Sequence, residues 1–430
     1  MGGIINELCS EITLPRMIPV RQLFAKDGIP EDKIAQAIRD ELESSSLKDR
    51  LKPGMRIAIT CGSRGISNIA QITASIAAFV KKAGAVPFVV PAMGSHGGAS
   101  AEGQKALLEG YGVNEETIGC QIISSMETVV IGQCEIPGGE TVNVRIDKNA
   151  AFADGIIVAG RVKPHTDFRG NYESGLMKMM AIGLGKREGA DICHKLGFEY
   201  MPEMVRRFGK TILANTPVIL GFAVIENARD ETCKVKALSP EEIEEQEPAL
   251  LEEARSRLPL IPFEKADVLV IDRIGKNISG NGMDPNITGP SPCSPWVKSN
   301  FSATRTVLLD LTEETHGSAF GMGAAHVITK RLFGKIDYDA TYVNAVTSRG
   351  IDFVRIPAMA DNDKEAVQLA IRTCTGHDPD NIRIIRIADS LSTKEFFISR
   401  ALLGEAEKNP LLEILGESED WHFDKEGNLL

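Results

Sequence analysis

The stretch "MRIAITCGSRGISNIAQITASIAAFVKKAGA", residues 55–85, carries the pattern that identifies the fold class. Residues 55–60 form a short apolar run, which is typical of a buried strand, and the turn "GSRG" follows directly. The apolar residues then recur at helical spacing until Gly84, where a helix is expected to end. A buried strand, a polar loop and a helix in this order predict an α/β fold with parallel strands.

The same order recurs along the chain. "VPFVVPAMG" (86–94) and "GIIVAGRV" (155–162) read as further strands that lead into polar loops. "ADVLVIDRIG" (266–275) starts a second series of the same kind. The strongly charged segment 239–258 is expected to be a helix with a solvated face, or a connector.

A chain of 430 residues is too long for one ordinary core. We therefore predict two α/β domains, each a mostly parallel sheet with flanking helices, and an active site in the cleft between them. Residues 1–262 are predicted to form the N-terminal domain, which binds the cofactor and carries the catalytic residues. Residues 263–400 are predicted to form the domain that closes the cleft, and no place is assigned to the tail, 401–430.

Composition excludes several classes of function. The formal net charge of −11 and the lack of a long basic run argue against a nucleic-acid-binding surface. No apolar run reaches the roughly 20 residues of a membrane span, and the start "MGGIINELCSE" does not resemble a signal peptide. The eight cysteines include no CxxC pair, which is typical of reduced thiols. We expect a cytoplasmic protein with no membrane or nucleic-acid partner.

Three polar loops follow predicted strands and carry Arg64, His96 and His165. In open α/β sheets, ligands bind at the carboxyl ends of the strands. Two histidines facing one pocket can act as acid and base on opposite faces of a substrate carbon, and an arginine suits a carboxylate or phosphate. In the alternative interpretation, each histidine makes only local hydrogen bonds in its turn and Arg64 binds backbone carbonyls.

Lys178 lies in "ESGLMKMMAIGLGKREGADICH" (173–194), between Leu and Met residues. A buried ammonium is costly unless it is paired or neutralised. Three interpretations remain open: a lysine whose stem covers apolar surface while its head reaches water, a desolvated lysine that forms a Schiff base, and a lysine joined covalently to a cofactor through an amide-like bond.

The order His96, His165, Lys178, His194 resembles the nickel-pincer lactate racemase family. His96 lies in "MGSHGG" and His165 in "HTDFRG"; Lys178 follows in a Gly-rich apolar stretch, and His194 comes sixteen residues after it. The "GSRG" turn stands where the family has its arginine loop. The resemblance covers about the first 200 residues by motif order, and the second half only loosely.

The resemblance implies a definite cofactor and chemistry. Lys178 would carry a pyridinium mononucleotide through a thioamide, whose two sulfurs and ring carbon clamp nickel, and His194 would supply the fourth nickel ligand. His96 and His165 would be the acid/base pair. Ser63 and Arg64 would contact the cofactor, with Arg64 also binding the substrate carboxylate. Four ligands in a plane suit Ni(II). Enzymes that build the cofactor would be the loading partners.

The implied activity is racemisation or epimerisation at C2 of a 2-hydroxy acid, by hydride transfer to and from the nucleotide. The polar loop "GKNISGNGMDPNITGPSPCSPW" (275–296) offers more hydrogen-bonding groups than lactate needs, which favours a larger sugar acid such as an aldonate. The alternative is a surface loop rich in turn residues. The substrate candidates in the second half are Lys276, Asp284, Asn286 and His316.

Two other functions stay open at this stage. A nicotinamide-dependent oxidoreductase is disfavoured because no GxGxxG follows the first strand, and neither "GSRG" nor "GLGKREG" matches a phosphate-binding motif. A two-domain protein that closes over a small anion without catalysis would need Arg64 and the loops, but no modified lysine.

Overall fold

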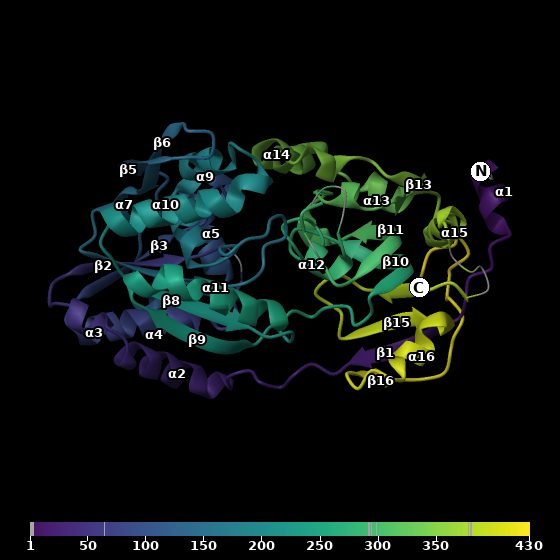
Figure 1. The fold of residues 1–430 in the computed structure, drawn as a ribbon, viewed down its shortest axis with the longest axis horizontal. Helices are drawn as coiled ribbons and strands as arrows, with labels where there is room; N and C mark the ends of the chain where they lie inside the picture. Colours follow the sequence, from purple (N-terminus) through teal and green to yellow (C-terminus); the bar gives the residue numbers. More distant parts are fainter. Residues whose placement is uncertain are drawn as a thin grey trace. The chain divides into compact units, whose positions relative to one another are not determined.

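The computed structural model describes residues 4–63, 65–290, 293, 295–297, 299–376, 378 and 381–430; of residues 5, 6 and 347 it describes the backbone alone. The chain forms two compact units, one of residues 25–258 and one that combines residues up to 24 with 259–430. Each unit is an α/β structure whose mostly parallel sheet is flanked by helices (Figure 1). The predicted fold class is confirmed.

The unit of residues 25–258 contains a six-stranded sheet in the order β4-β3-β2-β7-β8-β9. All neighbouring strands are parallel except the pair of β8 and β9 at one edge. In sheet order the strands are β4 (Gln121–Ile122), β3 (Val86–Pro91), β2 (Arg56–Cys61), β7 (Gly155–Arg161), β8 (Val218–Glu226) and β9 (Thr232–Leu238).

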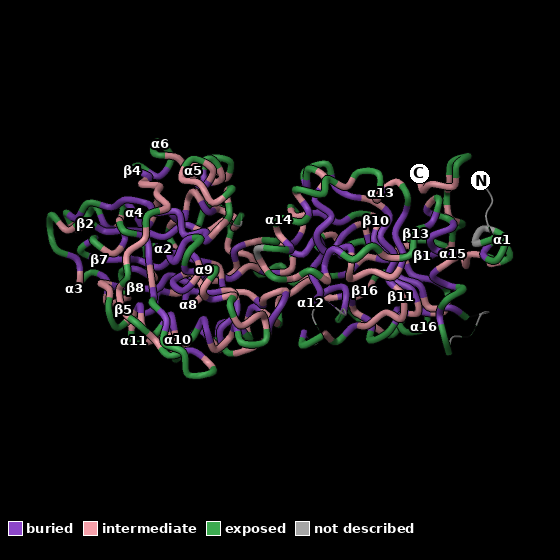
Figure 2. Tube along the Cα trace, turned by 90° about the horizontal axis from the view of Figure 1, so that it is seen from above, coloured by how far each residue is buried: buried purple, intermediate pink, exposed green. Residues whose placement is uncertain are grey.

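Helices cover both faces of this sheet because successive strand residues point to opposite sides. Ile57 and Ile59 pack into one cluster and Ala58 into the other, and Figure 2 shows the buried strands between exposed outer segments. The helices on the first face include α2 (Glu31–Ser44), α4 (Ile69–Lys82) and α5 (Ala101–Gly110). Those on the second face include α8 (Leu176–Lys178), η2 (Met179–Leu184), α9 (Lys186–His194), α10 (Met201–Asn215) and α11 (Pro240–Ser256).

Shorter elements complete this unit. The strands β5 (Thr128–Glu135) and β6 (Thr141–Asp147) form a separate antiparallel pair that packs against α10 and α9. The remaining helices are α3 (Leu47–Arg50), α6 (Glu115–Ile118), α7 (Lys148–Ala151), η1 (Gly97–Ala99) and η3 (Phe198–Tyr200).

The second unit contains an eight-stranded sheet in the order β13-β12-β11-β10-β14-β15-β1-β16. The strands from β13 to β14 are parallel, and the pairings from β14 to β16 are antiparallel. The strands are β10 (Lys265–Ile274), β11 (Ser302–Leu311), β12 (Val327–Thr329), β13 (Ala358–Ala360), β14 (Ile384–Ile387), β15 (Glu395–Ser399), β1 (Met17–Gln22) and β16 (Leu412–Ile414). The longer helices are α1 (Ile4–Ser10), α14 (Tyr338–Ser348) and α15 (Asp363–Thr373), and the short ones are α12 (Pro285–Thr288), α13 (Lys330–Gly334), α16 (Leu403–Ala406) and the turns η4 (Glu313–Thr315), η5 (Met322–Ala324), η6 (Ile351–Val354) and η8 (Arg400–Leu402).

Both ends of the chain belong to this second unit. This division of the chain differs from the predicted domain limits of 1–262, 263–400 and 401–430. The first strand, β1, pairs with β15 and β16, because sheet hydrogen bonds join residues far apart in sequence, which local patterning does not reveal. The tail is held in the same way: the Trp421 indole N–H donates to Pro15 O at 2.9 Å, and the Leu429 N–H to the Asp363 carboxylate at 2.8 Å. Among the described residues, no helix is both long and apolar enough to span a bilayer.

Candidate active site in the unit of residues 25–258

The loops after β2 and β3 meet through Ser63 and His96, whose Oγ and Nδ1 atoms lie 2.5 Å apart. The Tyr111 hydroxyl donates to the Ser63 carbonyl at 2.9 Å and fixes the first loop. Gly97 has φ +64°, and a Cβ there would lie 2.7 Å from the backbone N of Gln104. The His96 loop therefore needs glycine at this point, and the partner of the His96 ring is a side chain from the neighbouring strand's loop.

His165 lies in the loop after β7 and is held by backbone contacts. Its Nδ1 accepts the Asp167 N–H at 3.0 Å, so the neutral ring carries its proton on Nε2. Its own backbone N–H donates to the Glu173 carboxylate at 2.7 Å, and its ring stacks on Phe168 with centroids 4.1 Å apart. The side chain is 14% exposed. The sequence placed His165 in this loop, but nothing in the sequence indicated how its tautomer is set.

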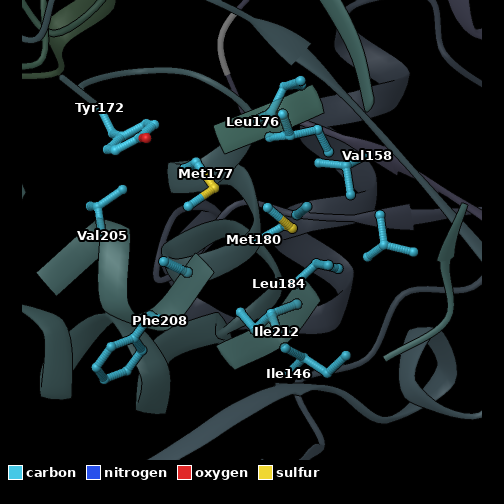
Figure 3. Packing of buried hydrophobic residues seen from close by; sticks show 14 of the residues in the cluster. Ile146, Val158, Tyr172, Leu176, Met177, Met180, Leu184, Val205, Phe208 and Ile212 are labelled. Carbon is cyan, nitrogen blue, oxygen red and sulfur yellow. The ribbon is translucent and has the colours of Figure 1, made fainter. Parts of the chain in front are cut away.

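Lys178 ends α8 and is half-buried, while its neighbours Met177 and Met180 are fully buried. Figure 3 shows Leu176, Met177, Met180 and Leu184 within the core that this segment shares with α10. The next turns, η2, are π-helical, a geometry that is frequent at functional sites. The lysine is therefore at the edge of the apolar stretch rather than inside it.

The Lys178 segment lies against the carboxyl ends of three strands. A Cβ on Gly62, after β2, would lie 3.1 Å from Met179 Cε, and a Cβ on Gly160, in β7, would lie 2.9 Å from it. The Gly94 N–H, after β3, donates to Gly183 O at 3.2 Å. These contacts bring Lys178 to the sheet edge from which the Ser63, His96 and His165 loops leave.

His194 ends α9, and its Nδ1 lies 2.7 Å from Ala190 O. A carbonyl oxygen only accepts hydrogen bonds, so Nδ1 carries the proton and the lone pair of the neutral ring is on Nε2. The edge of the ring meets Phe198 with centroids 5.8 Å apart. A backbone carbonyl that fixes the tautomer in this way is common behind metal-binding histidines.

Positive charge converges on His165. Burial lowers its pKa well below the usual value, and the charges of Lys178, His194, Lys163 and Arg169 lower it further. His165 is therefore neutral at pH 7, and the Asp167 carboxylate also lies nearby, 3.7 Å from its Nδ1. Three of these residues, His165, Lys178 and His194, are candidates that the sequence predicted. Lys163 and Arg169, which also lower this pKa, were missed, although both stand within four residues of His165 in the sequence.

A metal ion near Lys178 and His194 would need several donor atoms. Within the part of the chain that the structure describes, no three His, Cys, Asp or Glu side chains gather to hold an ion. The described side chains therefore offer no complete coordination shell, and a metal here would bring its other donors with it. His194 Nε2 as a single protein ligand, with Lys178 as the point of attachment, fits the pincer nucleotide implied by the resemblance.

The sequence analysis missed the lysine that is fully buried, Lys186. Its ammonium donates to Pro91 O at 2.5 Å and to Gln104 Oε1 at 3.1 Å, and it lies 3.2 Å from the Asp147 carboxylate. Burial lowers its pKa, and Asp147 opposes the shift. Gln104 in turn donates to His96 O at 3.2 Å. Lys186 and Gln104 therefore support the His96 loop together. The surrounding sequence, "GLGKREG", does not indicate this burial.

The substrate candidates in the second unit mostly serve local structure. The Asp284 carboxylate caps α12, accepting the Asn286 N–H at 2.9 Å and its side-chain amide at 2.7 Å. The Lys276 ammonium lies 5.3 Å from the centre of the Phe320 ring. His316 is exposed and has φ +48°. Arg64 lies outside the described residues, and its role stays a prediction from the sequence.

Comparisons with known proteins give little further guidance. No family model matches the sequence, and no curated protein matches it. Among solved structures, the chain is similar to the lactate racemase apoprotein from Thermoanaerobacterium thermosaccharolyticum, with a TM-score of 0.49 and 13% sequence identity, over 87% of this chain and 99% of that chain. A likeness of this size carries no correspondence between residues, so the function below rests on this chain's own site.

Proposed function

We propose that this chain is a racemase or epimerase that inverts C2 of a 2-hydroxy acid, using a nickel-pincer nucleotide tethered to Lys178. The observation that carries the proposal is the gathering of the Ser63, His96 and His165 loops and the Lys178 segment at one edge of the sheet, where Lys178 and His194 are close enough to affect the pKa of His165. Lys163 and Arg169 keep their charges when Lys178 is tethered and favour a carboxylate, and Lys178 and His194 are the residue types from which the motif resemblance draws a tether and a nickel ligand.

Each residue has a role that its contacts support. His96, whose Nδ1 lies 2.5 Å from Ser63 Oγ, is proposed to accept the hydroxyl proton of the substrate. His165 donates a hydrogen bond from Nε2 to the same oxygen, because its Nδ1 is engaged by the Asp167 N–H. Lys163 and Arg169 favour the substrate carboxylate, and Arg64 is proposed to bind it directly.

The cofactor would supply the hydride chemistry. Held by Lys178 and His194, the nucleotide would supply the reversible hydride acceptance that inversion at C2 of a hydroxy acid requires. His194, oriented by Ala190 O, would provide the protein's ligand to nickel. Lys276, Asp284, Asn286 and His316 stay candidates for binding a sugar acid on the sequence alone.

The decisive experiment is mass spectrometry of the Lys178 peptide, with nickel analysis, on protein produced together with the cofactor-building enzymes. We expect a nucleotide-sized adduct on Lys178 and about one nickel per chain, as one tether and one ligand imply. The control is Lys178→Arg, which keeps the charge but cannot form the amide-like bond. The loaded protein is then incubated with lactate and with a panel of aldonates, and the products are separated by chiral chromatography.

The variants His96→Ala and His165→Ala are expected to retain adduct and nickel but to lose turnover by roughly 10²- to 10⁴-fold, the usual contribution of a general acid–base group. Unchanged turnover would remove these roles. An unmodified Lys178 without nickel, in a host that loads a lactate racemase, would contradict the proposal and favour the protein that binds a small anion without catalysis.

A further inference from the structure

The helix α11 makes three contacts with one short segment, residues 172–177, which lies between His165 and Lys178. The sequence suggested that this charged helix is a solvated connector. The structure instead packs it on β8 and α8, with Ile243, Glu247, Leu250, Leu251 and Ala254 buried.

The first contact depends on a proline. Pro248 lies inside α11 and has no N–H, so the carbonyl four residues earlier loses its helical partner. That carbonyl, of Glu244, accepts the Tyr172 hydroxyl at 2.6 Å instead. Proline normally weakens a helix, but here Pro248 leaves the Glu244 carbonyl available to accept a hydrogen bond from the neighbouring segment.

The second contact is at the start of α8. The carboxyl group of Glu247, 1% exposed, accepts the Met177 N–H at 2.9 Å. The first N–H groups of a helix have no partner within it, so an acceptor there fixes where the helix begins. A Cβ on Gly175 would collide with this carboxyl group. Glu247 therefore sets the position of the turn that carries Lys178.

The third contact reaches the His165 loop. The Arg255 guanidinium donates to the Glu173 carboxylate at 2.9 Å. Glu173 is fully buried and also accepts the N–H groups of His165 at 2.7 Å and Gly170 at 3.2 Å. Glu247 and Arg255 are about two turns apart on one rigid helix, roughly 12 Å along its axis.

We infer that α11 is a positioning element, which fixes the separation between His165 and Lys178 through Glu244, Glu247 and Arg255. The inference rests on the proposed function for the roles of those two residues. It identifies Glu247 and Tyr172 as positioning residues, because neither needs to touch the substrate to act. Loss of the hydrogen bond made by Glu247 or by Tyr172 would loosen the segment that joins His165 to Lys178.

The test uses the full chain without cofactor and has two readouts. The first is the rate at which acetic anhydride modifies the Lys178 amine, measured by mass spectrometry. The second is the pH titration of the His165 ring, followed by NMR of labelled histidine. Glu247→Met keeps the volume but removes the acceptor, whereas Glu247→Gln keeps a carbonyl that accepts the Met177 N–H. Glu245→Met, on the exposed side of the same helix, is the matched control.

We expect Glu247→Met to raise the Lys178 rate about fivefold, the change that corresponds to one lost hydrogen bond, and to shift the His165 titration toward its ordinary range. Glu247→Gln and Glu245→Met are expected to stay close to wild type. Tyr172→Phe, which removes one hydroxyl, is expected to act in the same direction and more weakly, and it serves as the test if Glu247→Met does not fold.

Unchanged labelling and titration in a folded Glu247→Met protein, or in Tyr172→Phe, would overturn the inference. Equal effects of Glu245→Met would also overturn it, because they would show a response to any change on α11. Since the protein carries no cofactor in this experiment, the result does not depend on turnover. A loaded wild type without racemase activity would instead contradict the proposed function and leave the labelling result standing.

Discussion

The loops after β7 and β10 both leave the carboxyl end of a parallel strand, yet their polar groups are used differently. In the loop after β10, Asp284 and Asn286 bind each other and cap a single turn of helix. In the loop after β7, Glu173 is bound by Arg255, which comes 82 residues later. Most polar groups of the first loop hold that loop together, and Glu173 in the second ties the His165 loop to α11.

The difference teaches where a ligand site should be sought. The 275–290 loop is rich in polar residues, and for that reason the sequence favoured it as a substrate site, but much of its hydrogen bonding is satisfied within the loop. The loop that carries His165 is less conspicuous in sequence. The pKa of its histidine is lowered by burial and by neighbouring positive charges, and groups with perturbed pKa values cluster at functional sites.

Among substitutions in the two loops, the largest effect on the free energy of unfolding is expected at Glu173. Glu173→Gln removes the buried carboxylate that Arg169 and Arg255 share, and removing one partner of a buried ion pair costs about 3–5 kcal/mol. The two tryptophans, Trp296 and Trp421, are both in the second unit. The loss should therefore appear in urea unfolding followed by circular dichroism and leave the tryptophan fluorescence transition in place. A shift of the fluorescence transition of equal size would contradict this assignment.

A second effect concerns the α11 contact and depends on pH. Burial raises the pKa of Glu247 from 4.5 to about 8. The folded state then binds the proton more tightly than the unfolded state, so this stabilisation is present at low pH and is lost as pH rises from about 4.5 to about 8. Glu247→Gln cannot titrate. Wild type should lose stability relative to this variant by up to about 1.4 kcal/mol per pH unit across that window.

The measurement is urea unfolding of both proteins at several pH values, followed by circular dichroism. A constant difference between wild type and Glu247→Gln from pH 5 to pH 8, about the window given by these two pKa values, would show that Glu247 does not titrate in the folded protein.

A third effect, of opposite sign, comes from His165. Its pKa is lowered by burial first and by neighbouring positive charges second, so the unfolded state binds the proton more readily. Stability should fall as pH decreases below about 6.5, by up to about 1.4 kcal/mol per pH unit. His165→Gln removes this slope, and Glu247→Gln does not. Parallel pH profiles for wild type and His165→Gln would show that the ring is protonated in the folded state.

The regular elements could be predicted from the sequence because their patterns are local. The apolar runs 55–60, 155–162 and 266–275 correspond closely to β2, β7 and β10. The edge of the first sheet could also be predicted, since the carboxyl ends of parallel strands carry the loops. Lys186 could not, because its burial depends on Pro91, Gln104 and Asp147, which approach it only after folding.

Long-range pairing sets the same limit for the rest of the site. Nothing within the segment 239–258 indicates that Glu247 meets the start of α8, and its acidic composition favours a solvated helix. The pairing of β1 with β15 joins positions about 380 residues apart. Motif order gave the candidates His165, Lys178 and His194, but their electrostatic coupling follows from the fold.

The smallest effect distinguishes a structural role of the 275–290 loop from a role in substrate binding. Asp284→Ala removes a helix cap and should cost about 1 kcal/mol, seen as a shift of the tryptophan fluorescence transition. Asp284→Asn keeps an equivalent cap and should leave the transition in place.

In the loaded enzyme, a carboxylate that only caps α12 gives Asp284→Asn an unchanged KM for an aldonate. A carboxylate that binds the hydroxyls of the substrate gives a KM raised about tenfold, since a hydrogen bond to a charged group contributes about 1.5 kcal/mol. Because the carboxylate already accepts two hydrogen bonds from Asn286, the unchanged KM is the expected result.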